Sequence, residues 1–384
     1  MRVVYVCSDP GIPVFGTKGA SLHVRAVLGE LLRRGCEVHL ICARRGEGSP
    51  GAAAGLIKAG LTVHELPRMS GPREAAAQAG DAAVAPVLTR IQADAPVDLV
   101  YERYSLWGRT ATAWAAEAGV PSILEVNAPL PAEASTYRDL HDVAGATEVA
   151  RSAISAAGTV ICVSDPVRSW ASALTDDPAR VHTVPNGVDT RRIHPGSPRE
   201  SESFTTGFVG TLKPWHGVDV LIQAMAQLVQ RNPAHRLLVV GDGPQHKRLQ
   251  ALTDHLGITA NVEFTGAVAE SAVPELLQRM DVACAPYPAG VNFYFSPLKV
   301  YEYLAAGLPV VASRIGSLPE LLSGSGILVT PGEADDLAEA IDGLRVDPRR
   351  RAEMSRVARE TALQHDWAAV VDRIVGLGRV DVQI

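Results

Sequence analysis

Residues 296–311 read SPLKVYEYLAAGLPVV and combine a helix start, a central carboxylate and the following strand in one short run. Ser296 is a favourable N-cap residue, and Pro297 suits the first helical turn. The free backbone N–H groups there and the positive end of the helix dipole predict a phosphate-binding position. Glu302 follows about two turns later, where its carboxylate can accept hydrogen bonds from a ribose diol. Gly307 ends the predicted helix. Such a site suits a nucleotide sugar.

The chain has 384 residues, which exceeds one ordinary core and fits two domains. Hydrophobic residues make up 47% and charged residues 20%, as in a globular protein. A net charge of −6 argues against a general nucleic-acid binder. The five scattered cysteines predict buried, reduced thiols and a cytoplasmic location. No apolar run is long enough to span a bilayer, and residues 1–7 predict a strand rather than a secretion signal.

Short β-branched runs alternate with amphipathic helices in both halves, which predicts βαβ units and parallel sheets. In the first half we expect strands at residues 3–7, 37–42, 61–66, 99–102, 122–126, 159–164 and 181–184, and helices at 20–34, 73–93, 106–118, 142–157 and 166–174. In the second half we expect strands at 206–209, 236–240, 262–265, 282–285, 310–312 and 326–329. Residues 45–55 predict a loop, and residues 196–203 a polar linker. The fold class is therefore α/β, with two Rossmann-like domains facing across a cleft.

The run at 296–311 resembles the signature of the family 4 glycosyltransferases, which are retaining enzymes of the GT-B fold. Their pattern is a Glu, seven residues and a second Glu, followed by a small-residue helix end and a Pro-Val-Val strand. Glu302 is the second Glu, whereas Tyr294 stands in the first position. Similar family motifs are the Pro-Asn-Gly-Val-Asp turn at 185–189 and the Gly-Asp-Gly-Pro turn at 241–244, the second mainly architectural. The resemblance extends from Gly16 to the helix near Trp367.

The resemblance implies three domain segments: residues 1–190 for the acceptor, 191–365 for the nucleotide sugar, and a C-terminal helix at 366–384 that packs back on the first domain. It also implies that Glu302 holds the ribose and that Leu298, Lys299 and the Gly16–Gly19 loop hold phosphates, the first two through their backbone. The donor-sugar pocket is then lined by Tyr294, Phe295 and Ser296, and the base by backbone near Gly266.

A second phosphate-binding loop is expected at residues 210–217, which follow the first strand of the second half. The family usually places an Arg and a Lys here, where this chain has Thr211 and His216. Lys213 is the nearby cation, and we expect its side chain to act on the diphosphate with Glu302 as the two catalytic residues. The chain contains no Asp-x-Asp pair and no zinc-type histidine spacing, so we expect no metal and no other cofactor.

The acceptor is expected at strand ends of the first half. Candidate residues there are His23, Glu102, Tyr104, Glu125 and Asn127. Many family members carry a His on the loop at 124–130, where this chain has Asn127 and its neighbours. The acidic residues of this region, with Glu133 and Asp139, suggest an acceptor that bears an amino group. A solvated acidic rim explains the same residues without an acceptor.

The sequence therefore predicts a metal-independent, retaining transfer of a hexose, GlcNAc or glucose, from a nucleotide diphosphate sugar, with UDP as the expected nucleotide, to a small hydroxylated acceptor. Two alternatives stay open. A sugar-nucleotide 2-epimerase also uses two Rossmann-like domains, and a non-catalytic sugar-nucleotide-binding module would explain Tyr294, Thr211 and His216. A nicotinamide dehydrogenase is disfavoured, because the loop after the first strand lacks the Gly-x-Gly-x-x-Gly spacing.

Overall fold

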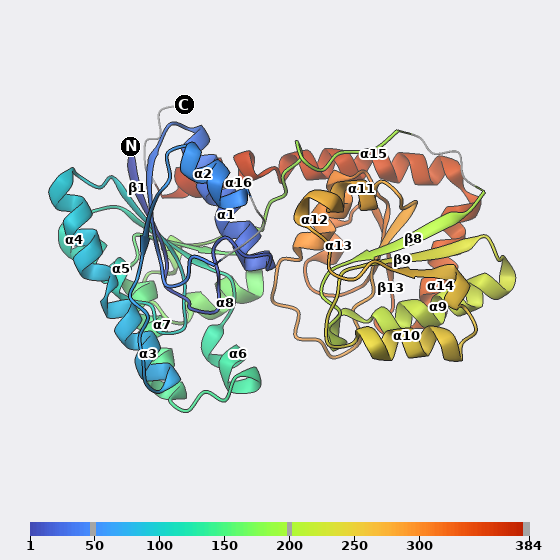
Figure 1. Cartoon of the computed structure of the whole chain (residues 1–384), viewed down its shortest axis with the longest axis horizontal. Coiled ribbons are helices and arrows are strands. Elements are labelled where there is room, and N and C mark those ends of the chain that lie inside the picture. Colours follow the sequence, from blue (N-terminus) through green and yellow to red (C-terminus); the bar gives the residue numbers. More distant parts are fainter. Residues whose placement is uncertain (47–50, 198–201, 379–384) are drawn as a thin grey trace. The chain divides into compact units, whose positions relative to one another are not determined.

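The computed structural model describes residues 1–46, 51–197 and 202–378 and contains two compact units (Figure 1). Unit 1 comprises residues 1–186, 294–296 and the C-terminal segment from 367, and unit 2 comprises residues 187–293 and 297–366. The chain passes between the units at Asn186/Gly187, on both sides of residues 294–296, and at Asp366/Trp367. The expected boundaries were 190/191 and 365/366.

Unit 1 is built on a parallel sheet with the strand order β3-β2-β1-β4-β5-β6-β7. The strands are β1 (Arg2–Cys7), β2 (Glu37–Cys42), β3 (Thr62–Glu65), β4 (Leu99–Arg103), β5 (Ser122–Val126), β6 (Thr159–Cys162) and β7 (Val181–Thr183). The helices are α1 (Gly19–Arg33), α2 (Ala52–Lys58), α3 (Arg73–Ala82), α4 (Val84–Asp94), α5 (Thr110–Ala118), α6 (Leu130–Tyr137), α7 (Val143–Ala156), α8 (Asp165–Ser172) and α16 (Trp367–Leu377).

Unit 2 repeats the architecture with the order β10-β9-β8-β11-β12-β13, again parallel. Its strands are β8 (Phe204–Val209), β9 (His235–Val240), β10 (Val262–Phe264), β11 (Val282–Ala285), β12 (Val310–Ser313) and β13 (Gly326–Val329). Its helices are α9 (Val218–Arg231), α10 (His246–His255), α11 (Val273–Leu277), α12 (Leu298–Ala305), α13 (Leu318–Leu321), α14 (Ala334–Val346) and α15 (Pro348–Gln364). The predicted α/β class with two Rossmann-like domains is confirmed.

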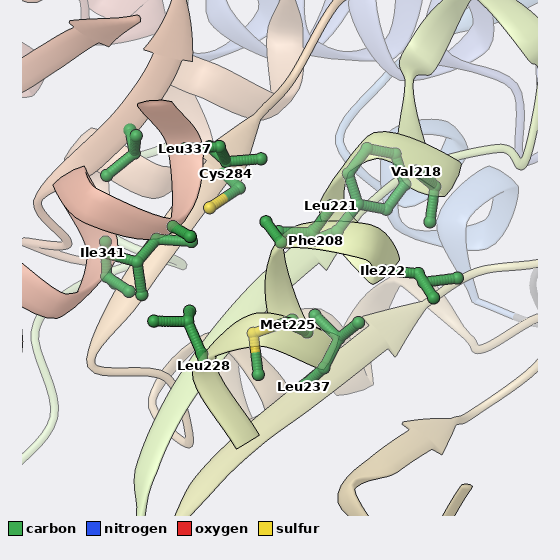
Figure 2. Close-up of a cluster of buried hydrophobic side chains, with 14 of the residues drawn as sticks. Phe208, Val218, Leu221, Ile222, Met225, Leu228, Leu237, Cys284, Leu337 and Ile341 are labelled. Atoms are coloured by element: carbon green, nitrogen blue, oxygen red, sulfur yellow. The ribbon is translucent and has the colours of Figure 1, made fainter. Parts of the chain in front are cut away.

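The two faces of each sheet are covered by different helices. In unit 1, apolar side chains of α4, α5 and α7 pack on one face, and α1 with α16 packs on the other, where Tyr5 and Tyr101 stack. In unit 2, α9, α10 and α14 enclose the main core with β8, β9 and β11. Figure 2 shows Phe208, Leu221, Met225, Cys284 and Ile341 turned toward one another in that core. This two-sided cover explains the uninterrupted apolar strands.

Two helix predictions for unit 1 were wrong in ways the sequence explains. The expected helix at 73–93 is divided at Ala83 into α3 and α4. Pro86 lacks an N–H and its ring conflicts with the carbonyl of Ala82, so one continuous helix is excluded. The expected helix at 106–118 begins only at Thr110, because the buried Asp81 carboxylate accepts hydrogen bonds from the Arg109 and Thr110 N–H groups and fixes the start there.

Three further expectations concern segments outside strands. Within the predicted loop at 45–55, α2 starts at Ala52, whereas residues 47–50 lie outside the described part of the chain. Residues 198–201 of the expected polar linker also lie outside it. Helix α6 was not predicted. The C-terminal helix α16 packs on α1 within unit 1, where the Trp367 ring contacts the edge of His23 at a centroid distance of 4.8 Å.

The unit 2 core gives a direct stability prediction. Ile341 on α14 is fully buried in the cluster of Figure 2, whereas Val346 at the end of the same helix is 61% exposed. We expect Ile341→Ala to lower the free energy of unfolding by about 3 kcal/mol, because the truncation leaves a cavity. The matched control Val346→Ala should change it by less than about 0.5 kcal/mol. Urea denaturation followed by circular dichroism measures both, and equal effects would contradict the assigned core.

Candidate functional site

Helix α12 is held against the end of β8 by the buried Tyr303 hydroxyl, which bonds to both backbone groups of Val209. The backbone N–H of Val209, the last residue of β8, donates to the Tyr303 hydroxyl over 2.8 Å. Tyr303 is fully buried. Because Glu302 precedes Tyr303, and Lys299 lies one turn earlier, this bond sets where both predicted donor residues lie. The carboxyl ends of parallel strands are where such sheets bind ligands.

Glu302 has an environment unlike that of an ordinary surface carboxylate. Burial raises its pKa to about 7, the nearby Glu270 acts in the same direction, and Arg192 and Lys299 oppose them. The Arg192 guanidinium lies 3.8 Å from Oε1 of Glu302, and the side chain of Glu302 is 17% exposed. The same guanidinium donates to the backbone oxygen of Glu270. Glu302 is therefore a largely buried carboxylate that keeps some exposure and can accept a ligand hydroxyl there.

The loop after β8 contains the residues expected to hold phosphate. His216 donates from Nδ1 to the Thr211 carbonyl over 2.6 Å. Burial lowers the pKa of His216 to about 3, and the positive charges of Lys299 and Lys213 add to this effect. His216 is thus neutral near pH 7 and supplies no charge. The Lys213 ammonium lies 5.5 Å from the centre of the exposed Trp215 ring.

The glycine turn after β9 is architectural, as expected. Gly241 has φ +127°, and a Cβ there would lie 2.2 Å from the Gly210 carbonyl oxygen. A Cβ at Gly243 would lie 2.6 Å from the Leu212 nitrogen. Gly241 also donates to the Gly266 carbonyl over 3.1 Å. Gly266, with φ +67°, has open space on the side where a Cβ would stand. The two glycines therefore shape the loop at 210–212, and Gly266 presents accessible backbone.

The predicted N-cap at Ser296 was wrong. Helix α12 begins at Leu298, and Pro297 occupies the cap position without a side-chain bond. Ser296 lies one residue before the cap position and bonds to Asn186 instead: its hydroxyl accepts from the backbone N–H of Asn186 over 3.1 Å, and its carbonyl accepts from the Asn186 side-chain amide. Tyr294 donates its hydroxyl to Glu133 over 2.8 Å, and its ring contacts Phe295. These three predicted donor-sugar residues belong to unit 1.

Glu125 is the centre of a buried polar network in unit 1. Its carboxylate accepts from Tyr101 over 2.5 Å, from Arg103 over 2.7 Å and from Asn127 over 2.5 Å. The His23 ring lies 2.9 Å from it. Burial alone would raise the pKa of Glu125, but the charges and hydrogen bonds of these neighbours, His23 first, hold it well below its usual value. Glu125 is therefore ionised and fully occupied by protein donors.

Two predicted acceptor residues, Glu102 and Tyr104, are instead core residues. Glu102 is fully buried, neither of its carboxylate oxygens has a hydrogen-bond partner, and burial raises its pKa to about 8, with the Asp81 carboxylate adding to the effect. Arg103 pairs with Glu125 across β4 and β5, so Glu102 faces the opposite side of the sheet. Tyr104 packs in the apolar cluster around α7. The sequence could not distinguish these directions, because both faces of a parallel sheet are buried.

The glycine loop after β1 is closed by its own contacts. A Cβ at Gly16 would lie 2.7 Å from the Pro13 ring, and the Gly16 carbonyl accepts from Arg25. Lys18 donates to the Gly11 carbonyl over 3.0 Å. Gly19 begins α1 without a side-chain cap, which leaves N–H groups of the first turn without an intrahelical partner. Gly16 therefore serves the tight turn, whereas phosphate binding at Gly19 stays a prediction.

A cavity of about 550 Å³ lies in unit 1 at the carboxyl ends of β1 and β4. The Ser8 and Ser105 hydroxyls in its lining are hydrogen-bonded to each other over 2.8 Å. The lining also supplies charged and aromatic side chains: Asp9, Arg73, Glu74, Trp107, Arg138, Asp139 and His141. This volume suits a sugar- or cyclitol-sized ligand. Asp139 was expected on the acceptor side, whereas Arg73 was not predicted, because it lies at a helix start that carries no motif.

Several other properties of the described residues bear on function. All five cysteines are free and buried, as predicted. Across residues 1–46, 51–197 and 202–378, no group of three or more His, Cys, Asp and Glu side chains is arranged to hold a metal ion. A search of the same residues for a helix that could span a membrane found none.

Comparisons with known proteins match both units. Residues 17–192 match the family model described as Glycosyltransferase Family 4, and residues 203–347 match Glycosyl transferases group 1. A D-inositol 3-phosphate glycosyltransferase of Stackebrandtia nassauensis is 28% identical over 93% of this chain and 86% of its own length. A GDP-mannose-dependent alpha-(1-6)-phosphatidylinositol monomannoside mannosyltransferase of Mycolicibacterium smegmatis is 34% identical, over 56% of this chain and 62% of its own.

Solved structures share the fold. The Anabaena protein Alr3699/HepE, solved in complex with UDP, aligns over 98% of this chain and 99% of its own with a TM-score of 0.73 and 21% identity. WaaG, a glycosyltransferase involved in lipopolysaccharide biosynthesis, aligns over 99% of this chain and 100% of its own with a TM-score of 0.69 and 17% identity. These likenesses identify the GT-B architecture.

The Glu125 network predicts a pH-dependent stability. Glu125→Gln should lower the free energy of unfolding by about 3 kcal/mol near pH 7, because it leaves Arg103 buried beside a neutral amide. The folded-state pKa of Glu125 is depressed, so its stabilisation is present above the unfolded pKa of about 4.3 and is lost as pH falls further. The difference in the free energy of unfolding between wild type and variant should therefore become smaller only below about pH 4. Thermal melts between pH 3 and pH 8 measure it, with exposed Glu117→Gln as control.

Proposed function

Because this chain belongs to the family 4 glycosyltransferases, we propose that it transfers a hexose from a nucleotide diphosphate sugar to a small polyhydroxylated acceptor. We further propose that the transfer retains the anomeric configuration and requires no metal ion. The observation that carries the proposal is the arrangement in unit 2, where Tyr303 fixes α12 to the end of β8 and Lys299, in the first turn of α12, lies against Gly210 of the loop that follows β8.

The chemistry needs positioning and charge stabilisation rather than a protein nucleophile. A hydroxyl oxygen of the acceptor forms a bond to the anomeric carbon as the bond from that carbon to the diphosphate breaks. The hydroxyl proton leaves with the nucleoside diphosphate. Glu302 accepts hydrogen bonds from the ribose, and backbone N–H groups at Leu298 and Lys299, with the Lys213 side chain, bind the diphosphate.

For the donor, we propose a UDP-hexose, UDP-GlcNAc or UDP-glucose, with GDP-mannose as its rival. The relative that is 34% identical is named as GDP-mannose-dependent, so GDP-mannose should be tested beside the UDP-hexoses. The turn at Gly241 and Gly266 offers backbone groups near the expected base position, and backbone groups alone do not select uracil over guanine. The five free thiols favour a reducing compartment, which agrees with a cytoplasmic location.

For the acceptor, we propose a polyol that occupies the 550 Å³ cavity of unit 1. The cavity offers both guanidinium and carboxylate groups, which suit a molecule rich in hydroxyls. The amino-bearing acceptor has less support than the sequence suggested, because Glu102 is buried on the other face and Glu125 is paired with Arg103. The relative that matches 93% of this chain is named for D-inositol 3-phosphate, so cyclitol phosphates belong in the test.

A donor screen tests the function. Purified full-length protein is mixed with common UDP-, GDP- and dTDP-sugars, with and without chelator, and nucleotide release and melting temperature are measured. We expect one donor to stabilise the protein and to release nucleotide when a polyol acceptor is present, with no loss on chelation. Glu302→Ala should weaken binding of that donor about tenfold, because a charged hydrogen-bond acceptor is lost, whereas exposed Glu320→Ala should not.

Each alternative outcome has a distinct meaning. Conversion of the donor to another sugar nucleotide without an acceptor would support the 2-epimerase. Donor binding without any turnover would support the non-catalytic module, which the replacements Thr211 and His216 favour. Donor turnover that needs an added divalent ion would contradict the metal-independent mechanism.

The acceptor cavity gives a separate prediction. Arg73→Ala should raise the acceptor KM about tenfold and leave the donor KM unchanged, because Arg73 lines the unit 1 cavity and supplies guanidinium donors there. Arg68→Ala is the matched control, since Arg68 is exposed and lies outside the cavity lining. Steady-state kinetics with the acceptor that gives turnover decides it. An unchanged acceptor KM for Arg73→Ala would place the acceptor elsewhere.

A further inference from the structure

Lys299 carries a buried ammonium group without a hydrogen-bond partner. It lies in the first turn of α12, and its Nζ is closed off from solvent although its stem is partly exposed. Two aromatic rings lie close to the amine: Nζ lies 4.4 Å from the centre of the Phe208 ring and 5.6 Å from that of Tyr287. Aromatic faces stabilise a cation only partly, so burying an ammonium group without hydrogen-bond acceptors costs free energy.

The ammonium lies at the predicted phosphate loop. A methyl group at Gly210 would lie 3.1 Å from Nζ of Lys299, so the amine lies against the residue that directly follows β8. The bond from Val209 to Tyr303 anchors α12 one turn further along, which fixes the base of the lysine side chain. Lys299 thus reaches from the start of a helix to the carboxyl end of the central strand, both of which favour anions.

The same loop lacks the charges that its family places there. Thr211 is neutral, and His216 is neutral near pH 7 because its pKa is about 3. Lys213 lies over the exposed Trp215 ring, on the solvent side of the loop. Among these residues, Lys299 is the one whose charged group is buried away from water. A buried charge interacts more strongly with a ligand than an exposed one.

We propose that the Lys299 side chain, and not only its backbone, binds the diphosphate and stabilises the charge that develops on it as the hexose departs. This inference rests on the proposed function and assigns the residue that replaces the family's Arg and Lys. The amine lies close to the Phe208 and Tyr287 rings, which offer it no oxygen acceptor. A bound diphosphate supplies the oxygen acceptors that the amine lacks.

A titration follows from this placement. Burial lowers the pKa of Lys299 to about 7, against the opposing effect of the Glu302 carboxylate. The other titratable or charged groups around it are His216 and Lys213 on the β8 loop, Tyr287 after β11 and Arg192 beside Glu302. An anionic ligand raises the pKa of an adjacent amine, so binding should take up a proton at pH values where the free amine is neutral.

The experiment is calorimetric titration of the full chain with UDP and with GDP, in buffers of different ionisation enthalpy. At pH 8 the nucleotide that binds should take up about one proton per molecule, and at pH 6 close to none, because Lys299 is then already protonated. Lys299→Met should abolish this uptake and weaken nucleotide binding about 100-fold. Lys299→Arg should retain more of the affinity but show no uptake, since arginine does not titrate.

Three further variants separate Lys299 from its neighbours. Lys213→Met should weaken binding but keep the proton uptake, and Glu302→Gln, which removes the other group with a pKa of about 7, should keep it too. Exposed Lys247→Met should change neither. If Lys299→Met does not fold, as judged by circular dichroism, the wild-type uptake profile and Lys299→Arg decide.

Two results would overturn the inference in different ways. Unchanged affinity and uptake in Lys299→Met or Lys299→Arg would make Lys299 a structural lysine and leave the proposed function intact. Failure of the wild type to bind either nucleotide would remove the proposed function together with the inference.

Discussion

The hydrogen bond from the Val209 backbone to the Tyr303 hydroxyl is the contact on which the unit 2 site depends. A parallel sheet orients its strands, but it does not by itself fix a helix that packs beside a strand end. This buried bond does so, because an unpaired Val209 N–H and Tyr303 hydroxyl would both carry a desolvation cost. Once α12 is fixed at Tyr303, helical geometry sets the positions of Glu302 and Lys299 relative to the loop at Gly210.

Two buried glutamates illustrate how neighbours decide the role of one residue type. Glu125 is surrounded by four donors, and its pKa lies well below the usual value. Glu302 has one guanidinium 3.8 Å away, and its pKa is raised to about 7. The first carboxylate is satisfied by the protein and organises its neighbours, including Asn127 at the end of β5. The hydrogen-bonding capacity of the second carboxylate is incompletely satisfied by the protein, as expected of a group that binds a ligand.

The sequence predicted the sheets well because the strands are short, mostly apolar runs that contain Val, Ile or Thr. Helix boundaries, in contrast, depended on contacts that periodicity does not encode. Asp81, far away in sequence, sets the start of α5, and Asn186 occupies the Ser296 hydroxyl that would have capped α12. The turn at 241–244 was predictable because glycines that follow a strand indicate a tight turn, although the contacts that require them, with Gly210 and Leu212, are distant in sequence. The direction of the Glu102 side chain was not predictable, because a strand buried on both faces shows no alternation of polar and apolar residues.

The role of Lys299 was hidden for a related reason. In the sequence it is one lysine in an apolar helix, three residues from Glu302, and a solvated surface residue would look the same. Only the fold shows that its amine lies between two aromatic rings beside Gly210. The loop has Thr211 and His216 where the family has cations. A positive charge can still be present at the same place, because a residue from another element can supply it. Motif positions therefore identify where a diphosphate binds more reliably than which side chain neutralises it.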